Sequence, residues 1–271
     1  MLQLVPTPIG NIADMTLRAM SALGEADLLL CEDTRVTKQL LHILKERYNL
    51  KTKERQRFIA LHSHNEEQFL KEVTPELFAQ NVVYVSDAGM PGISDPGMKL
   101  VEYAQRHGIE YDVLPGANAV LTAFAASGFQ ESRFLFFGFL PHKGRERALA
   151  LEAALSSGYV TILYESPHRL RKLLDEIRSK DPDRELFAAK ELTKRHQHYY
   201  RGTAAEILSR IDHNIKGEWV LILQKSSVSE GTATLSEEEI AALELPKKQK
   251  AKLLAKVTGK SVKECYNELL S

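Results

Sequence analysis

A turn rich in glycine and proline, residues 85–97, joins a short apolar run to a segment with the pattern of a helix. Glycine lets a backbone approach a ligand closely, and proline limits the conformations that the turn loses on binding. Similar turns occupy residues 4–11 and 114–118, each between an apolar run and a helix-like segment. Such turns line the carboxyl ends of the strands in an open α/β sheet, where ligands bind. We therefore expect a ligand site at these turns.

Apolar runs of strand length alternate with helix-like segments along the chain. Strands are expected at about 2–6, 27–31, 58–61, 82–86 and 111–114, with helices at about 16–24, 35–46, 65–79, 97–107 and 118–127. This alternation favours a mostly parallel sheet covered by helices. The pattern restarts after Gly128, with strands at about 134–138, 159–164, 186–190 and 218–223 and helices at about 144–157, 167–179 and 203–212. The sequence therefore predicts a second α/β domain.

Charge and cysteine content exclude several classes of protein. Lys and Arg together number 36, as do Asp and Glu, so any basic surface must be local. Cys31 and Cys265 lie far apart, which argues against a disulfide framework and a zinc site and fits a reducing cytoplasm. Because no apolar run approaches the roughly 18 residues that span a bilayer, we expect a soluble, unexported protein without a membrane partner.

The last forty or so residues differ in composition from the rest. Residues 226–231 form a short polar linker, and helix formers follow, broken by Pro246 and Gly259. From 246 to 263 there are seven lysines and no acid, with an apolar face from Leu253, Leu254 and Val257. Two short helices hinged at 258–259 would resemble a helix-turn-helix, and either a nucleic-acid contact or a solvated helix pair explains the lysines.

A series of short motifs between residues 3 and 224 carries a family resemblance. In order, they are Thr7-Pro-Ile-Gly-Asn11, Asp14-Met-Thr-Leu-Arg18, Glu32-Asp-Thr-Arg35, His62-Ser-His-Asn-Glu66, Ser86-Asp-Ala-Gly89, Ile93-Ser-Asp-Pro-Gly97, Pro115-Gly-Ala-Asn-Ala119, Gly138-Phe-Leu-Pro141, Tyr164-Glu-Ser-Pro-His-Arg169, Lys190-Glu-Leu-Thr-Lys194, Arg201-Gly-Thr203 and Gly217-Glu218. The chain resembles the ribosomal RNA small subunit methyltransferase I group, a branch of the tetrapyrrole methylase superfamily. It departs from that pattern at Met90, at Asn118 and at residues 196–198, and the last departure puts in doubt any role for acids after residue 194.

The resemblance implies two α/β domains, residues 1–116 and 117–228, followed by a helical tail at 229–271. It implies S-adenosylmethionine in the cleft between the domains, a homodimer, and methylation of a cytidine ribose 2′-hydroxyl in the decoding region of 16S rRNA in the small ribosomal subunit. The alternatives are a tetrapyrrole or a protein side chain as substrate, or an RNA-binding or ribosome-binding module without turnover. The basic second domain and the lysine tail favour RNA, and the intact 87–97 turn favours an enzyme.

The absence of a G-x-G-x-x-G after the first strand argues against an ordinary dinucleotide-binding fold, so the cofactor would meet several turns. The resemblance places five residues near its methionine portion: Asp87, Ala88, Gly89, Ile93 and Ser94. It adds Pro8 from the first turn, Asn118 and Ala119 from the third, and Phe139, Leu140, Gly202 and Thr203 closing over the adenine. Plain turn chemistry is the alternative for the glycines and prolines.

Removing the proton of a ribose hydroxyl during methyl transfer calls for a base, worth roughly 10²–10⁴-fold. The candidates are Glu32, Asp33, Glu191, His62, His64 and a perturbed Lys190, and the sequence does not rank them. Asp33 is equally suited to capping the next helix. Arg35 would hold a phosphate or pair with Glu32. The two histidines lack a third ligand at metal spacing, so no metal site is expected.

Cations occur in runs through the second domain. Those expected to contact RNA phosphates are Lys143, Arg145, Arg169, Lys194 and Arg201. Acids are interleaved with these cations, so the alternative is that the cations are only scattered, solvated surface charges. Tyr199 and Tyr200 would stack a splayed base or, as adjacent strand residues, point to opposite faces of a sheet.

Overall fold

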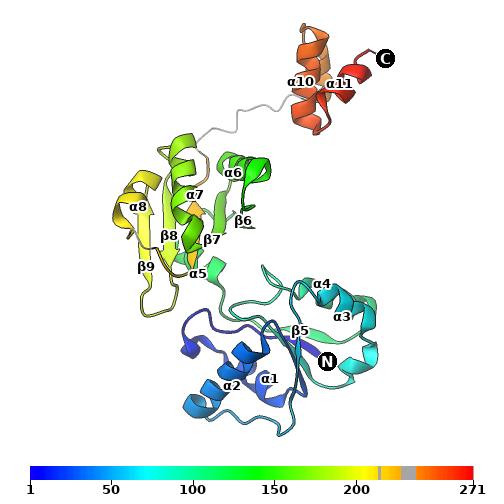
Figure 1. Ribbon diagram of the computed structural model, residues 1–271, viewed down its shortest axis with the longest axis vertical. Coiled ribbons are helices and arrows are strands. Elements are labelled where there is room, and N and C mark those ends of the chain that lie inside the picture. Colours follow the sequence, from blue (N-terminus) through cyan, green and yellow to red (C-terminus); the bar gives the residue numbers. More distant parts are fainter. Residues whose placement is uncertain (213–214, 227–235, 271) are drawn as a thin grey trace. The chain divides into compact units, whose positions relative to one another are not determined.

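The computed structural model describes residues 1–212, 215–226 and 236–270, which belong to two compact units, Met1–Lys225 and Ser226–Ser271 (Figure 1). The first unit contains two five-stranded sheets with helices, and the described part of the second is helical. The predicted class, α/β with a helical appendage, is confirmed. The expected boundary between residues 228 and 229 lies outside the described residues.

The first sheet is entirely parallel. Its strands are β1 (Leu2–Leu4), β2 (Leu28–Cys31), β3 (Arg57–Ala60), β4 (Val82–Val85) and β5 (Tyr111–Val113). They lie in the order β3-β2-β4-β1-β5, so β1 and β4 are neighbours although eighty residues separate them. The turns after β1, β2, β4 and β5 therefore meet at one edge of the sheet, as the sequence predicts.

Alternate residues of these strands face opposite layers of helices. The helices are α1 (Leu17–Glu25), α2 (Thr34–Tyr48), α3 (Glu66–Glu72) and α4 (Met98–Arg106), with 3₁₀ turns η1 (Ile12–Asp14) and η2 (Pro75–Ala79). Leu29 packs under α1 and α2, whereas Leu28 and Leu30 pack under α4 and η2. The single helix expected at 65–79 is wrong. It breaks before Pro75, which disfavours helical backbone at the residue that precedes it.

The second sheet is mixed. Its strands are β6 (Phe134–Phe139), β7 (Val160–Glu165), β8 (Leu186–Lys190), β9 (His198–Gly202) and β10 (Trp219–Leu223), in the order β6-β7-β10-β8-β9. Among these described strands, β6 and β7 pair in parallel, and the other neighbours pair antiparallel. Sequence reasoning assigned no bounds to β9, an edge strand in which Tyr200 is buried while Tyr199 and Arg201 are exposed. The two tyrosines thus point to opposite faces.

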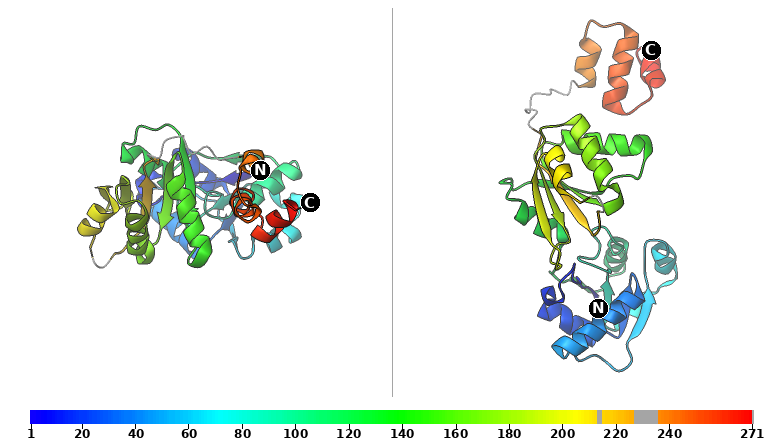
Figure 2. Two further views of the ribbon diagram at one scale, coloured as in Figure 1. Left: turned by 90° about the horizontal axis from the view of Figure 1, so that it is seen from above. Right: turned by 60° about the vertical axis from the view of Figure 1, so that its left-hand side comes forward.

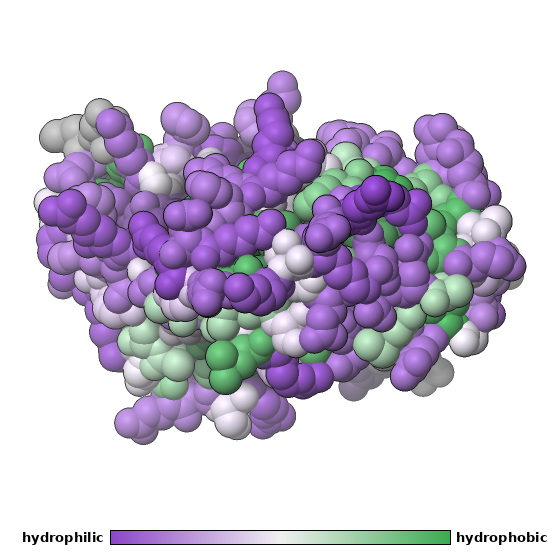
Figure 3. All heavy atoms as spheres, turned by 90° about the horizontal axis from the view of Figure 1, so that it is seen from below, coloured by the Kyte–Doolittle hydropathy of each residue, from purple (hydrophilic) through white to green (hydrophobic). Residues whose placement is uncertain are grey.

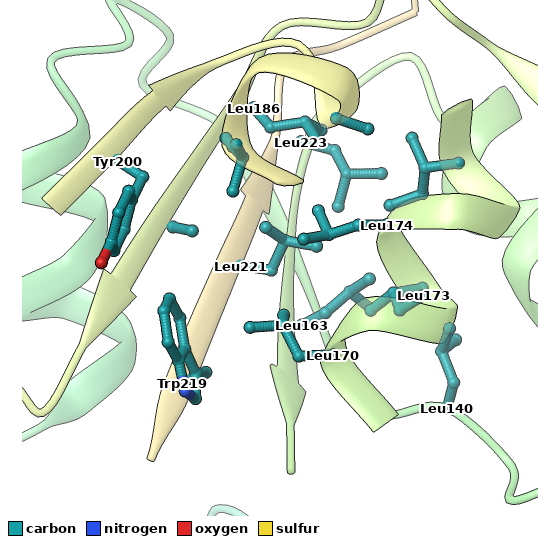
Figure 4. Close-up of a cluster of buried hydrophobic side chains, with 14 of the residues drawn as sticks. Leu140, Leu163, Leu170, Leu173, Leu174, Leu186, Tyr200, Trp219, Leu221 and Leu223 are labelled. Atoms are coloured by element: carbon teal, nitrogen blue, oxygen red, sulfur yellow. The ribbon is translucent and has the colours of Figure 1, made fainter. Parts of the chain in front are cut away.

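Helices cover both faces of this sheet, with α5 (Ala119–Ser127) on one side and α6 (Gly144–Ser156) and α7 (Pro167–Lys180) on the other (Figure 2, right). The helix α8 (Ala204–Arg210) packs beside α7. Figure 4 shows Leu163 and Leu221 of the strands against Leu170 of α7, with Tyr200 and Trp219 beyond them. Burial of such side chains is worth about 1.5–3 kcal/mol each and holds α7 on the sheet.

A buried charge network joins α6 to α7. The Arg147 side chain is 3% exposed and donates to Glu176 at 2.9 Å and to the Pro141 carbonyl at 3.2 Å. The fully buried Glu165 carboxylate lies 3.6 Å from Arg147 and 2.8 Å from Arg169. Arg169 also donates to the Leu140 carbonyl, so the network fixes the chain after β6.

The second unit has a small core of its own. Its helices are α9 (Glu237–Ala242), α10 (Lys247–Thr258) and α11 (Val262–Glu268), packed around Ile240, Ala251, Leu254 and Cys265. The predicted hinge matches the structure, because α10 ends at Thr258 and Gly259 caps it with φ +73°. The helix α9 lies in the stretch of helix formers before Pro246, for which sequence reasoning gave no separate bounds.

The face drawn in Figure 3 is covered mainly by hydrophilic side chains, with separate apolar patches between them. Apolar side chains scattered over a surface are normal for a folded chain. Within the described ranges, no helix is long and apolar enough to cross a membrane.

Candidate active site

A cavity of about 420 Å³ in the first unit receives side chains from both sheets. It is lined by Ile9, Glu32, Asp87, Ala88, Gly89, Met90, Ile93, Ser94, Asp95, Asn118, Ala119, Phe139, Tyr164, Glu165, Ser166, Pro167, Leu192, Glu218, Trp219 and Val220. Its volume falls within the range of roughly 300–1,000 Å³ that is usual for small-molecule sites.

Two backbone hydrogen bonds tie the turn after β1 to the turn after β4. Thr7 and Gly89 each donate to the other's carbonyl at 3.0 Å. Gly89 has φ +85°, and a Cβ placed there would lie 3.2 Å from the Ile9 side chain. Only glycine adopts this backbone easily, so it lets the two turns close against each other at the cavity wall.

The turn at 92–97 forms a closed loop. Gly92 donates to the Pro96 carbonyl at 3.1 Å, and Gly97 donates to the buried Glu66 carboxylate at 2.9 Å. Gly97 has φ +130°, and a Cβ there would lie 3.0 Å from the ring of Tyr84. The loop is thus anchored at its base, while Ile93 at its tip is 45% exposed toward the cavity.

Three carboxylates gather at one side of the cavity: Glu32, Asp87 and Asp95. Glu32 accepts a hydrogen bond from the Asp87 backbone at 3.1 Å, and Asp87 accepts one from the Asp33 backbone at 3.0 Å. Burial, followed by the charge of Glu32, raises the pKa of Asp87 above its ordinary value. Burial and the charges of Glu32 and Asp87 raise the pKa of Asp95 to about 6. The cluster would attract a cation and resists being fully ionised without one.

Aromatic side chains from the second sheet also line the cavity. A register shift between Phe136 and Gly138 redirects the end of β6, and Phe139 is 55% exposed at the cavity. Its ring lies 5.4 Å from that of Tyr164, between centroids. Burial raises the pKa of Tyr164 to about 12, so its hydroxyl stays protonated at neutral pH. Together with Trp219, these rings suit a flat, apolar group.

The cavity therefore combines an acidic cluster, aromatic rings and glycine-rich turns with accessible backbone. This set suits an organic cation that carries a flat ring. Among residues 1–212, 215–226 and 236–270, no group of three or more His, Cys, Asp or Glu side chains is arranged to hold a metal ion.

Many of the residues predicted for the cofactor lie together in this cavity. They are Asp87, Ala88, Gly89, Ile93, Ser94, Asn118, Ala119 and Phe139. Of the catalytic candidates, Glu32 is among them. Asn118 also caps α5, since its side chain accepts from the Leu121 backbone at 3.0 Å. A capping role and a place in the cavity thus coexist in one residue.

The other catalytic candidates lie outside the cavity lining. Asp33 caps α2 and binds the exposed Arg35 at 2.6 Å, and this contact holds the pKa of Asp33 at about 2. Arg35 therefore pairs with Asp33 rather than with Glu32. Lys190 lies over the ring of Trp219, and Glu191 accepts from Lys194 at 2.8 Å. Burial opposes but does not outweigh the hydrogen bonds that lower the pKa of Glu191.

Four expected cofactor residues are also outside the lining. Pro8 precedes the lining residue Ile9, and Leu140 is buried in the core beneath α7. Gly202 ends β9, and Thr203 forms a capping box with Glu206 at the start of α8. The rings of His62 and His64, the two histidine candidates for the base, meet edge-on with 5.9 Å between their centroids. Both residues lie outside the cavity lining.

The cations predicted to bind RNA fall into two groups. Lys143 and Arg145 are exposed at the start of α6 and have no ion-pair partner in the described part of the chain. Three others are committed to contacts: Arg169 to Glu165, Lys194 to Glu191 and Glu218, and Arg201 to Glu185.

Sequence reasoning missed the lining residues Asp95, Tyr164, Glu165, Glu218 and Trp219. Asp95 lies within the 85–97 turn. The motifs that carried the family resemblance contain Tyr164, Glu165 and Glu218, but these residues had no assigned role. The available signal for Asp95 was a second acid in the same turn as Asp87.

Known proteins are similar to this chain in sequence and in fold. A family model described as Tetrapyrrole (Corrin/Porphyrin) Methylases matches residues 1–208. A Helicobacter pylori protein called ribosomal RNA small subunit methyltransferase I is 48% identical, with 100% of this chain and 98% of the relative covered. Its namesake from Campylobacter fetus is 42% identical, with 100% of both chains covered.

Two solved structures share the fold at low sequence identity. A crystal structure of diphthine synthase has a TM-score of 0.60 at 16% identity and covers 82% of this chain and 89% of that one. The uroporphyrin-III C-methyl transferase of Thermus thermophilus, complexed with S-adenyl homocysteine, has a TM-score of 0.53 at 14% identity and covers 81% and 96%.

Proposed function

This chain belongs to the tetrapyrrole methylase family, in its ribosomal RNA small subunit methyltransferase I group, and we propose that it methylates a ribose 2′-hydroxyl of a cytidine in the decoding region of 16S rRNA, with S-adenosylmethionine as donor. The observation that carries the proposal is a cavity lined by an acidic cluster and by aromatic rings, within a chain similar to the named relatives over its full length. Action in the cytoplasm and assembly as a homodimer belong to the same proposal.

The cavity residues fit the proposed cofactor. When bound, S-adenosylmethionine supplies a methyl group from a positively charged sulfonium. The carboxylates of Glu32 and Asp87 would favour its positive charge, and Phe139 offers a ring for its adenine. The turns at 87–94 and 118–119 would hold it through their backbone and short side chains.

Methyl transfer depends mainly on the alignment of the accepting oxygen, the methyl group and the sulfur. A base that takes the proton from O2′ of the ribose adds to this. Among the lining carboxylates we assign this role to Asp95, because a pKa of about 6 suits a base that works near neutral pH. Burial and the neighbouring acids are the cause of that pKa, so the cluster itself prepares the base.

A tetrapyrrole or a protein side chain is the second candidate substrate. The likeness to uroporphyrin-III C-methyl transferase and diphthine synthase supports it only at the level of the fold. A module that binds RNA without turnover is the third candidate, and the anchored 92–97 loop at the cavity favours an enzyme over it.

The test is methyl transfer to small ribosomal subunits that lack the modification. The purified protein is incubated with isotopically labelled S-adenosylmethionine and the subunits, and the digested RNA is analysed by nucleoside mass spectrometry. We expect label in 2′-O-methylcytidine. Transfer to neither subunits nor naked 16S rRNA, with cofactor binding intact by calorimetry, would refute the RNA substrate.

A further inference from the structure

A second cavity, of about 650 Å³, lies where the first turn meets the 191–195 segment and the end of α2. It is lined by Gly10, Asn11, Ile12, Ile43, Arg47, Thr193, Lys194 and Arg195. Three of these side chains are cationic, and none of the eight is an acid. Its lining shares no residue with the first cavity.

The three cations differ in how far their charge is already offset. Lys194 binds Glu191 at 2.8 Å and Glu218 at 3.0 Å. Arg47 and Arg195 are exposed, and neither has an ion pair or a side-chain hydrogen bond to any described residue. The cavity thus presents two guanidinium groups whose donors are free for a ligand.

The segment that carries Arg195 is held in a costly backbone conformation. Glu191 has φ +52° and Thr193 has φ +63°, which residues other than glycine rarely adopt. Hydrogen bonds hold this shape, since Thr193 donates to the Gln197 side chain at 2.6 Å and its hydroxyl accepts from the Asn11 backbone at 3.0 Å. Backbone strain that surrounding contacts maintain is typical of functional sites.

Neighbouring residues of the same two segments line the two cavities. Ile9 and Leu192 face the first cavity, whereas Gly10 and Thr193 face the second. On each segment, the step from one cavity to the other is a single residue. The two cavities are therefore neighbours along both segments.

We propose that the second cavity binds a phosphodiester group of the RNA substrate, with Arg47 and Arg195 as its contacts. This inference rests on the proposed function and adds a site for the substrate strand beside the reacting ribose. Arginine suits the role because its planar fork donates two parallel hydrogen bonds to a phosphate. Energy from such a remote contact holds the reacting ribose in place.

The test is the double variant Arg47→Ala and Arg195→Ala, measured for binding to 16S rRNA across a salt series and for methylation of small subunits. Loss of a charged hydrogen-bonding partner predicts about a tenfold weaker affinity for each arginine. The slope of log affinity against log salt should become shallower by about 0.7 for each lost phosphate contact. S-adenosylmethionine affinity should stay unchanged, which shows that the variant is folded.

Lys45→Ala is the matched control, because Lys45 is exposed on the same helix, two residues from Arg47, and outside the cavity lining. It should change RNA affinity less than twofold, as a rough bound for an isolated surface charge. Arg47→Lys with Arg195→Lys should recover the salt slope but not the full affinity, because the charge returns without the fork.

The outcomes separate this inference from the function on which it rests. If the unaltered protein methylates subunits and the double alanine variant matches it in RNA affinity and salt slope, the phosphate site is refuted and the proposed function stands. If the unaltered protein neither binds nor methylates RNA, both are refuted. An equal loss of RNA affinity in Lys45→Ala and in the double variant would also refute the site, since it would show that RNA responds only to the general positive charge of the surface.

Discussion

Replacing Asp95 by asparagine should make the protein more stable and less active. Its carboxylate is crowded by Glu32 and Asp87, and burial raises its pKa from 3.8 to about 6. The proposed base is therefore held in an environment that disfavours its charged form. A neutral side chain of nearly the same shape removes that penalty but cannot accept a proton from the substrate.

The sign and size of the stability effect follow from the two pKa values. Below pH 3.8 the carboxyl is protonated in both folded and unfolded chains, so it causes no penalty. Between 3.8 and about 6 the unfolded chain loses the proton first, and stability falls as pH rises. At pH 8 the penalty is complete, at most about 3 kcal/mol, and at pH 5 it is about half of that.

Urea unfolding of the ligand-free protein at pH 5 and pH 8 measures this effect. The gain in unfolding free energy of Asp95→Asn over the unaltered protein should be about 1 kcal/mol larger at pH 8 than at pH 5. Asp183→Asn, at an exposed acid outside both cavities, should show no such difference. At saturating substrate, Asp95→Asn should turn over roughly 10²–10⁴-fold more slowly. A gain that is equal at both pH values, or normal turnover, would refute the reasoning.

Two further changes probe the framework of the site. Arg147→Ala removes a buried cation from Glu176 and from the fully buried Glu165, which keeps Arg169, and should lower the unfolding free energy in urea by about 3 kcal/mol. Arg178→Ala, at an exposed ion pair, should cost less than about 1 kcal/mol. Gly89→Ala should destabilise the fold by about 1–2 kcal/mol in the same assay, since the new Cβ meets Ile9 at positive φ; an unchanged midpoint would contradict this.

The first sheet was predictable because its local pattern carries the information. The buried strand β2 reads Leu-Leu-Leu-Cys, and turns rich in glycine or proline separate several such runs from the helices. By contrast, β9 has one buried side chain, Tyr200, between exposed neighbours. Such a strand is specified by its pairing with β8, which no short window of sequence contains.

The candidate site likewise contains some residues that the local sequence predicts and others that only the tertiary arrangement brings in. Asp87, Ser94 and Asn118 follow parallel strands of one sheet. A rule about strand ends predicted that their turns meet, and the family resemblance supplied these residues as cofactor contacts. Tyr164 and Trp219 reach the cavity from the second sheet, and their approach depends on how that sheet faces the first. No local periodicity encodes this, and neither residue had been given a role.

The surroundings of Gly10 restrict which residues can replace it in relatives of this chain. A Cβ at Gly10 would clash with the Lys194 side chain and lie 2.7 Å from the Leu192 carbonyl, although the glycine has no positive φ to favour it. The restriction is therefore one of space, set by backbone more than 180 residues away. A larger residue at this position would require a compensating change around 192–194. Substitutions in the two segments should therefore occur together among homologues.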